Sequence, residues 1–159
     1  KNSAVQQSLH QFKYKGRKEI GFYFGRCIGQ ALKKSGRFKN CQLILPLPLH
    51  ASRERTRGYN QATVLGEGIS EIMQIPLISG ALVRVSGTAT QTHKNRIQRW
   101  QNMANKFRVI HPEKLLDKHI LLVDDVITTG ATLEACAQTL LRLENSTLSI
   151  ATLAYSVSG

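Results

Sequence analysis

The residues best suited to chemistry lie in one stretch, residues 120–133, which reads ILLVDDVITTGATL. Two adjacent carboxylates, Asp124 and Asp125, follow a run of aliphatic residues. Carboxylates only accept hydrogen bonds, so they suit sugar hydroxyls or a hydrated Mg²⁺. A turn of small residues comes next and offers hydroxyls and backbone N–H groups to a phosphate: Thr128, Thr129, Gly130, Ala131 and Thr132.

The elements that must position these residues are a strand, a turn and a helix. Residues 120–123 favour a strand, and the spacing of Leu133, Ala137 and Leu140 predicts a helix after the turn. In such a βα unit the N–H groups of the turn and the positive end of the helix dipole favour an anion. Gly130 permits a backbone conformation that a Cβ would forbid. The stretch therefore predicts a sugar-phosphate site.

The stretch has two other interpretations. One is an ordinary strand-to-helix turn with surface acids, and the other is a response-regulator receiver, which also pairs acids for Mg²⁺. A receiver places its acidic pair after the first strand, whereas Asp124 and Asp125 come late in this chain. The sugar-phosphate interpretation is therefore favoured, and a strand-loop-helix context is what it requires.

The same residues resemble the phosphoribosyl pyrophosphate (PRPP) motif of type I phosphoribosyltransferases. The resemblance implies that Asp124 and Asp125 hold the ribose hydroxyls and act in catalysis. It also implies that residues 128–132 hold the 5′-phosphate, and that Mg²⁺ accompanies PRPP with the two acids as its indirect ligands. The implied fold is α/β, with a central, mostly parallel sheet flanked by helices and a flexible hood loop.

A second unusual segment spans residues 41–62. The run CQLILPLPL predicts a buried strand that ends in a Pro-containing loop, and HASRERTRGYNQA places Arg53, Arg55 and Arg57 in the first turns of a helix. Ligands bind at this end of the strands in parallel α/β sheets. Guanidinium groups match phosphate geometry, which favours an anion site over arginines that only coat a helix.

The string LPLPLHASRERTRGYNQA resembles the bacterial competence protein F family. The resemblance implies a pyrophosphate loop here, with the candidates Pro48, Leu49, His50, Arg53, Arg55 and Arg57. It also implies a role in DNA uptake during natural transformation, with single-stranded DNA and other competence proteins as partners. Members usually carry a cysteine-rich zinc ribbon ahead of this domain. Residues 1–159 contain no such ribbon, so we interpret them as one phosphoribosyltransferase-like domain.

Residues 86–106 are polar and have few aliphatic side chains, which predicts a lid or binding loop. The family resemblance implies a hood that closes over the reacting centre, with Arg99 as a candidate for catalysis and for pyrophosphate. The pattern of Gln91, Arg99, Asn102 and Phe107 also resembles the competence family. The alternative is a nucleic-acid contact in which Trp100 stacks on a base.

The net charge of +12 is concentrated in residues 1–60, which carry +11. This imbalance predicts a polyanionic partner, either a pyrophosphate or a nucleic acid. Four cations surround Tyr14 and form either a nucleic-acid or phosphate patch or a solvated face: Lys13, Lys15, Arg17 and Lys18.

The remaining features predict one cytoplasmic domain. No apolar run is long enough to span a bilayer, no signal peptide is evident, and the three separate cysteines support neither a disulfide framework nor a zinc site. Residues 6–39 predict two helices that break near Tyr14–Gly16 and are weakened by glycines, and residues 62–73 predict another helix. The expected core strands are residues 41–45, residues 75–85 with an interruption at Ser79–Gly80, residues 120–123 and residues 148–157, and residues 107–110 are expected to add a further strand.

Two classes of function are therefore open. One is a PRPP-dependent phosphoribosyltransferase, in which a nucleophile displaces pyrophosphate at the anomeric carbon. The other is a protein without turnover, either a single-stranded DNA-binding module or a PRPP-sensing regulator. The sequence does not specify the acceptor nucleophile.

Overall fold

The computed structural model describes residues 4–85 and 106–156. A three-stranded parallel sheet with the order β1-β4-β5 forms its centre, and a separate two-stranded antiparallel sheet joins β2 to β3. The strands are β1 (Leu43–Pro46), β2 (Leu82–Arg84), β3 (Phe107–Val109), β4 (His119–Ile127) and β5 (Thr147–Tyr155). The helices are α1 (Ala4–Tyr14), α2 (Lys18–Ser35), α3 (Ala51–Arg57), α4 (Gln61–Met73), α6 (Ala131–Leu140) and a 3₁₀ turn at Pro112–Lys114.

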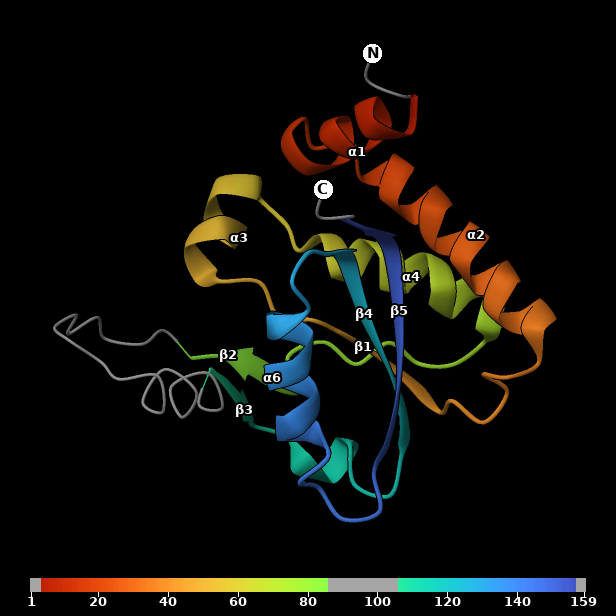
Figure 1. The fold of residues 1–159 in the computed structure, drawn as a ribbon, viewed down its shortest axis with the longest axis vertical. Coiled ribbons are helices and arrows are strands. Elements are labelled where there is room, and N and C mark those ends of the chain that lie inside the picture. Colours follow the sequence, from red (N-terminus) through yellow and green to blue (C-terminus); the bar gives the residue numbers. More distant parts are fainter. Residues whose placement is uncertain (1–3, 86–105, 157–159) are drawn as a thin grey trace, which may run out of the picture.

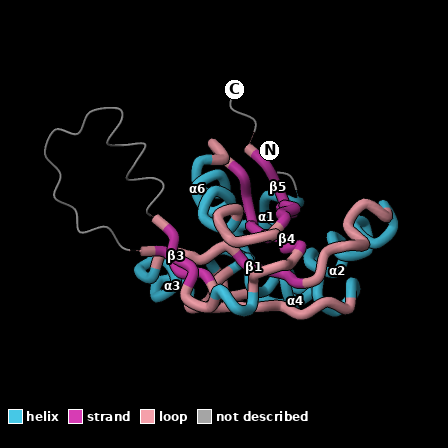
Figure 2. The backbone as a smooth tube through the Cα atoms, turned by 90° about the horizontal axis from the view of Figure 1, so that it is seen from below, coloured by secondary structure: helices cyan, strands magenta, loops and turns pink. Residues whose placement is uncertain are grey.

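The central sheet is covered on both faces, as Figures 1 and 2 show. Leu45 and Leu122 belong to the core cluster under α6, whereas Ile44 and Leu121 belong to the cluster under α1, α2 and α4. This alternation follows from the period of two along a strand. Burial on both faces also explains why β1 and the first half of β4 are continuous aliphatic runs. The α/β expectation is confirmed.

Helices α2 and α4 approach closely because glycines face each other at their contact. A Cβ on Gly25 would meet the carbonyl of Leu65, and one on Gly68 would meet the backbone of α2 at Phe22. Gly29 packs against Ile69 and Ile72 in the same way. The glycines of α2 that weaken its helical propensity in the sequence therefore serve the packing of this helix.

Helix α1 is fastened to the body by Phe12, whose side chain is fully buried. The ring packs against Gly21 of α2 and lies 5.9 Å from the ring of Tyr59, and the Tyr59 hydroxyl donates to the Phe12 carbonyl. The chain turns between α1 and α2 at Gly16, which confirms the predicted break.

The expected core strand over residues 75–85 is wrong. Only Leu77 forms a parallel bridge, to Ile44, flanked by hydrogen bonds of 2.8 Å from Ile44 N to Pro76 O and from Ile78 N to Ile44 O. Pro76 has no N–H to extend a ladder, and Gly80 turns the chain at φ +79°. β2 then pairs with β3 instead, as an antiparallel ribbon.

Two other expected elements are present in the described residues. β3 lies within the strand expected at residues 107–110, and α4 matches the helix expected at 62–73. Cys41 and Cys136 are buried, Cys27 is exposed, and all three thiols are free. No helix within residues 4–85 and 106–156 is long and apolar enough to cross a membrane. The expected lid, residues 86–106, lies outside the described residues except for Lys106.

Candidate functional site

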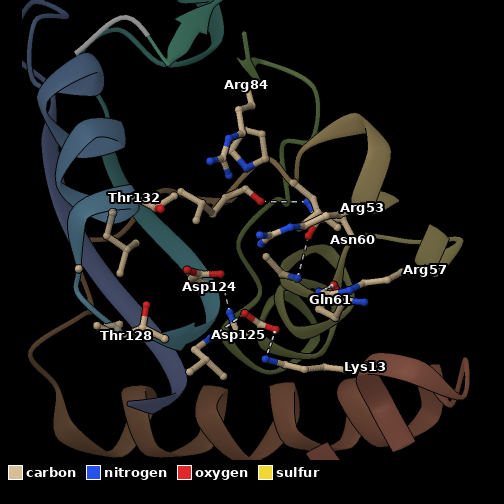
Figure 3. A pocket seen from close by; sticks show the side chains of 18 of the residues that line it. Lys13, Arg53, Arg57, Asn60, Gln61, Arg84, Asp124, Asp125, Thr128 and Thr132 are labelled. Atoms are coloured by element: carbon tan, nitrogen blue, oxygen red, sulfur yellow. Dashed lines mark hydrogen bonds and ion pairs between the residues drawn. The ribbon is translucent and has the colours of Figure 1, made fainter. Parts of the chain in front are cut away.

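A polar cavity of about 220 Å³ lies at the carboxyl ends of β1 and β4. Figure 3 shows Asp124 and Asp125 in its middle, between the loop that carries Thr128 and Thr132 and the side chains of Arg53, Arg57 and Gln61. Its other walls come from Lys13, Leu47, Pro48, Leu49, Asn60, Ala62, Arg84, Val126, Ile127, Thr129, Gly130 and Leu133. A parallel sheet binds ligands at this edge.

The acidic pair lies within β4, which continues to Ile127, so the expected end of this strand at Val123 is wrong. Asp124 still pairs with Thr152 of β5. Its Oδ1 accepts from Asp125 N at 2.8 Å, and Asp125 Oδ1 accepts from Val126 N at 2.7 Å. These local bonds fix both carboxylates and occupy one oxygen of each.

The Asp124 carboxyl is costly to ionise in the ligand-free protein. Burial, followed by the charge of Asp125, raises the pKa of Asp124 to about 7. Such a carboxyl is half protonated near neutral pH in the ligand-free protein. A cation or hydroxyl donors in the cavity would favour its charged form.

Within the described residues, the acidic pair makes one salt bridge, between Lys13 and Asp125. Its Nζ lies 3.0 Å from Asp125 Oδ2, and the two side chains are only 21% and 16% exposed. Oδ2 is buried and receives no hydrogen bond in this arrangement, so the contact is one of charge alone. A ligand could use Asp125 Oδ2 as an acceptor only by sharing it with the Lys13 amine or displacing that amine.

The turn after β4 has the form of an anion site. Gly130 adopts φ +75° and precedes the first residue of α6, and no side chain caps this helix. Thr128 and Thr129 are exposed. Thr129 Oγ1 accepts from Ala131 N at 3.4 Å, so the N–H groups of Thr132 and Leu133 are the ones at the start of this ten-residue helix that can donate to a ligand.

Three arginines form the opposite wall. Arg57 is half-buried and its Nη1 donates to Gln61 Oε1 at 2.8 Å. Arg53 and Arg84 both line the cavity, and burial followed by the charge of Arg53 lowers the pKa of Arg84. No salt bridge found in the described parts of the chain neutralises Arg53 or Arg84. Adjacent unpaired guanidinium groups favour a bound anion.

Residues 57–62, which read RGYNQA, connect the elements that form this wall. Gly58 ends α3 at φ +77°, and Tyr59 anchors α1. Asn60 Nδ2 donates to Leu47 O at 2.9 Å, while Asn60 Oδ1 accepts from Ala62 N at 3.0 Å and caps α4. Gln61 is 1% exposed and its Nε2 has no partner. The motif therefore ties β1, α3 and α4 together at the cavity.

The structure brings most of the candidate residues into this cavity. Residues 128–132, expected to hold a phosphate and called the phosphate turn here, contribute Thr128, Thr129, Gly130 and Thr132. The expected pyrophosphate loop contributes Pro48, Leu49, Arg53 and Arg57. Three candidates do not line it: Ala131, Arg55 and His50. His50 caps α3 instead, since its Nδ1 accepts from Ser52 N at 3.3 Å. Arg99 lies outside the described residues.

The side chains of the basic cluster around Tyr14 have separate partners, and the nucleic-acid role of the cluster stays a prediction. Lys13 turns to Asp125, Arg17 pairs with Glu19, and Lys18 Nζ lies 5.2 Å from the centre of the Tyr59 ring. Sequence reasoning missed three residues of the cavity: Gln61, Arg84 and, as a partner of the acids, Lys13. Of these three, only Gln61 could have been found from the sequence, because it belongs to the unusual string RGYNQA.

The donor set fits a metal that the ligand brings with it. No group of three or more His, Cys, Asp or Glu side chains within the described residues could hold a metal ion. Two adjacent carboxylates, one with an unbonded buried oxygen, match Mg²⁺ that keeps waters and is carried by substrate phosphates.

The parallel sheet, the turn after β4 and the acidic pair define an α/β domain with a polar cavity at the carboxyl ends of its strands. Comparison with known proteins identifies the family of this domain. The profile of the phosphoribosyl transferase domain matches residues 60–159, so the chain belongs to this family. Solved structures agree on the fold. Glutamine PRPP amidotransferase from B. subtilis, complexed with ADP and GMP, aligns with a TM-score of 0.61 at 14% identity, over 91% of this chain and 30% of that one.

Relatives extend the similarity to the N-terminal part. The DNA utilization protein YhgH of Salmonella typhimurium is 34% identical over 145 residues, or 89% of this chain and 63% of the relative. Competence protein F of Haemophilus influenzae is 32% identical over 85% of this chain and 61% of the relative. The chain thus spans less than two thirds of the length of these relatives. The resemblance to the competence protein F family is confirmed.

Proposed function

We propose that this domain binds PRPP with Mg²⁺ as a phosphoribosyltransferase. The observation that carries the proposal is the cavity in which paired acids, a phosphate turn and three arginines face one another. Each alone is a common feature of α/β proteins. Together they offer acceptors for sugar hydroxyls and donors for two separate phosphate groups, which is the chemistry of PRPP.

The three parts take different portions of the ligand. The N–H groups of residues 129–132 and the Thr hydroxyls hold the 5′-phosphate, and Asp124 and Asp125 accept from the ribose hydroxyls. Arg53, Arg57 and Arg84 take the pyrophosphate. Mg²⁺ bound to the ligand supplies further charge neutralisation beside the acidic pair.

The reaction is a displacement at the anomeric carbon. The bond from this carbon to the pyrophosphate oxygen breaks, the oxygen leaves with the electron pair, and the acceptor nucleophile forms the new bond. This chain contributes position and charge: the acids hold the ribose, and the arginines stabilise the charge that develops on the leaving group. The acceptor loses its proton to solvent or to a group of its own.

The biological setting that we propose is DNA uptake. It rests on the names of the relatives, DNA utilization protein and competence protein F, and on the +11 charge of residues 1–60. Partners in that setting are single-stranded DNA and other competence proteins. The protein is proposed to work in the cytoplasm.

A second candidate is a nucleic-acid-binding role without turnover. The observation that favours it is Tyr14, which is 65% exposed and has the Arg57 guanidinium 5.6 Å from its ring centre. An exposed aromatic ring beside cations suits a stacked base next to its phosphate. This role predicts a steep fall in DNA affinity with salt, and neutralising Lys15 and Lys18 should flatten the slope. A salt-independent affinity would contradict it.

Calorimetry of PRPP binding tests the main proposal. We expect binding in the presence of Mg²⁺ that is at least tenfold weaker with EDTA, and weaker binding of ribose 5-phosphate and of pyrophosphate when each is titrated alone. Release of pyrophosphate on addition of an acceptor separates an enzyme from a PRPP-sensing regulator. Failure of PRPP and Mg²⁺ to bind would refute the proposal.

A further inference from the structure

The salt bridge between Lys13 and Asp125 occupies the place where a ribose hydroxyl would bind. Lys13 belongs to α1, far from the acids in sequence, and its amine reaches the one Asp125 oxygen that lacks a hydrogen bond. A ligand hydroxyl that donates to this oxygen must share it with Lys13 or displace the amine. The free protein therefore holds its own cation in the ribose position.

The backbone of Lys13 is held in place by its neighbour, whereas its side chain can change conformation. The neighbouring Phe12 is buried, and its carbonyl accepts from Tyr59, so the end of α1 cannot easily move. The side chain of Lys13 has a flexible four-carbon stem. An exchange of partners thus requires a change of side-chain rotamer and no movement of the helix.

Lys13 also has an anion site within reach on its other side. It lines both the cavity with the acids and a neighbouring cavity of about 570 Å³ between α1 and α3. Arg53 and Arg57 line both cavities as well. None of the residues that line the second cavity is a carboxylate. An amine released from Asp125 would therefore face the arginines and the pyrophosphate that they attract.

We propose that Lys13 is a positioning residue that exchanges Asp125 for the pyrophosphate when PRPP binds. In the free protein it neutralises Asp125. Ribose hydroxyls and the metal then take over the carboxylate, and the amine joins the arginines at the leaving group. The inference rests on the proposed function, and it predicts that Lys13 discriminates between ligands with and without a pyrophosphate.

The test compares PRPP with ribose 5-phosphate, which has the same ribose and 5′-phosphate but no pyrophosphate. In Lys13→Met, calorimetry should show PRPP affinity lowered about tenfold or more. Affinity for ribose 5-phosphate should be unchanged or higher, because the competitor for Asp125 is gone. Lys13→Arg, which keeps the positive charge, should bind PRPP as tightly as the wild type. Lys15→Met, the same charge loss at an exposed site outside both cavities, should change neither affinity.

A lysine that is only a structural counter-ion gives a different result. Lys13→Met would then lower both affinities by the same factor, or neither, and the inference would be overturned. Failure of the wild type to bind PRPP would instead refute the proposed function.

A second measurement needs no substitution. Labelling of the wild type with an amine reagent, read by mass spectrometry, should increase at Lys13 with ribose 5-phosphate and decrease with PRPP. Equal labelling with both ligands would also overturn the inference.

Discussion

Arg57 Nη1 donates to Gln61 Oε1 across 2.8 Å, and this bond fixes the orientation of the Gln61 amide beside the cavity. The Nε2 of the same side chain is buried and has no acceptor. Leaving such a donor unpaired costs free energy in the empty protein. A phosphate oxygen in the cavity would satisfy it, so we count Gln61 among the ligand-binding residues.

Replacing Gln61 should separate binding from stability. Gln61→Leu removes the unpaired donor and keeps the volume, so the free energy of unfolding should change by less than about 1 kcal/mol. PRPP affinity should fall about tenfold or more, because a hydrogen bond to a charged oxygen is lost. Denaturant unfolding and calorimetry measure the two effects. Unchanged affinity would mean that the amide does not contact the ligand.

Gly130 and Gly36 make a matched pair for testing the phosphate turn. Both adopt a positive φ, +75° and +68°, and neither would have a neighbour within 4 Å of an added Cβ. Gly130→Ala and Gly36→Ala should therefore each cost about 1 kcal/mol of stability. Only Gly130→Ala should also weaken binding of ribose 5-phosphate, because Gly36 caps α2. Equal effects on binding would contradict the assignment of the turn.

The raised pKa of Asp124, about 7, predicts a pH-dependent stability. The folded protein holds this proton more tightly than the unfolded chain, so the stabilising effect is present at low pH and disappears as pH rises through about 7. The variant Asp124→Asn does not ionise at this position, so its stability does not fall in this way as pH rises. The gain in unfolding free energy of the variant over the wild type should thus be larger by about 1 kcal/mol at pH 8 than at pH 6. A gain that is independent of pH would contradict the shifted pKa.

The same carboxyl should control binding with the opposite trend. Mg²⁺ and ribose hydroxyls need ionised Asp124, so the affinity for PRPP with Mg²⁺ should increase as pH rises from 6 to 8. Calorimetry at constant Mg²⁺ measures the trend, and Asp124→Asn titrated in parallel gives the pH dependence that comes from ligand ionisation alone. An affinity that falls over this range would show that the protonated form binds.

The glycine contact between α2 and α4 can be tested by adding one methyl group. Gly25→Ala places a Cβ against the carbonyl of Leu65 and should cost about 1–3 kcal/mol by overpacking, although alanine is the better helix former. Gln30→Ala, at an exposed position of the same helix, should change stability by less than about 0.5 kcal/mol. Thermal and denaturant unfolding compare the two variants. A stabilised Gly25→Ala would contradict the packing.

The sequence predicted the parts of the fold whose cause is local. The aliphatic run before Asp124, the Gly130 turn and the break at Gly16 follow from propensity and backbone sterics, and the structure has all three. The ribbon of β2 and β3 was not predicted, because its pairing depends on contacts between distant segments. The role of Gly25 was hidden for the same reason, since only its partner on α4 explains it.

The candidate site followed a similar division. Acids and turn residues that are adjacent in sequence were found together, and they line one cavity. Lys13 was assigned to a basic cluster because its neighbours in sequence are basic, while the fold of α1 turns its amine toward Asp125. Arg84 had no local signal and reaches the cavity only because β2 ends beside it.

The measurement that tests the central claim most directly is a crystal structure of the protein with PRPP and Mg²⁺. The account predicts the 5′-phosphate within hydrogen-bond distance of the N–H groups of residues 129–132, the ribose hydroxyls on Asp124 and Asp125, and the pyrophosphate beside Arg53. Density for PRPP elsewhere, or a ribose that does not touch either carboxylate, would contradict it.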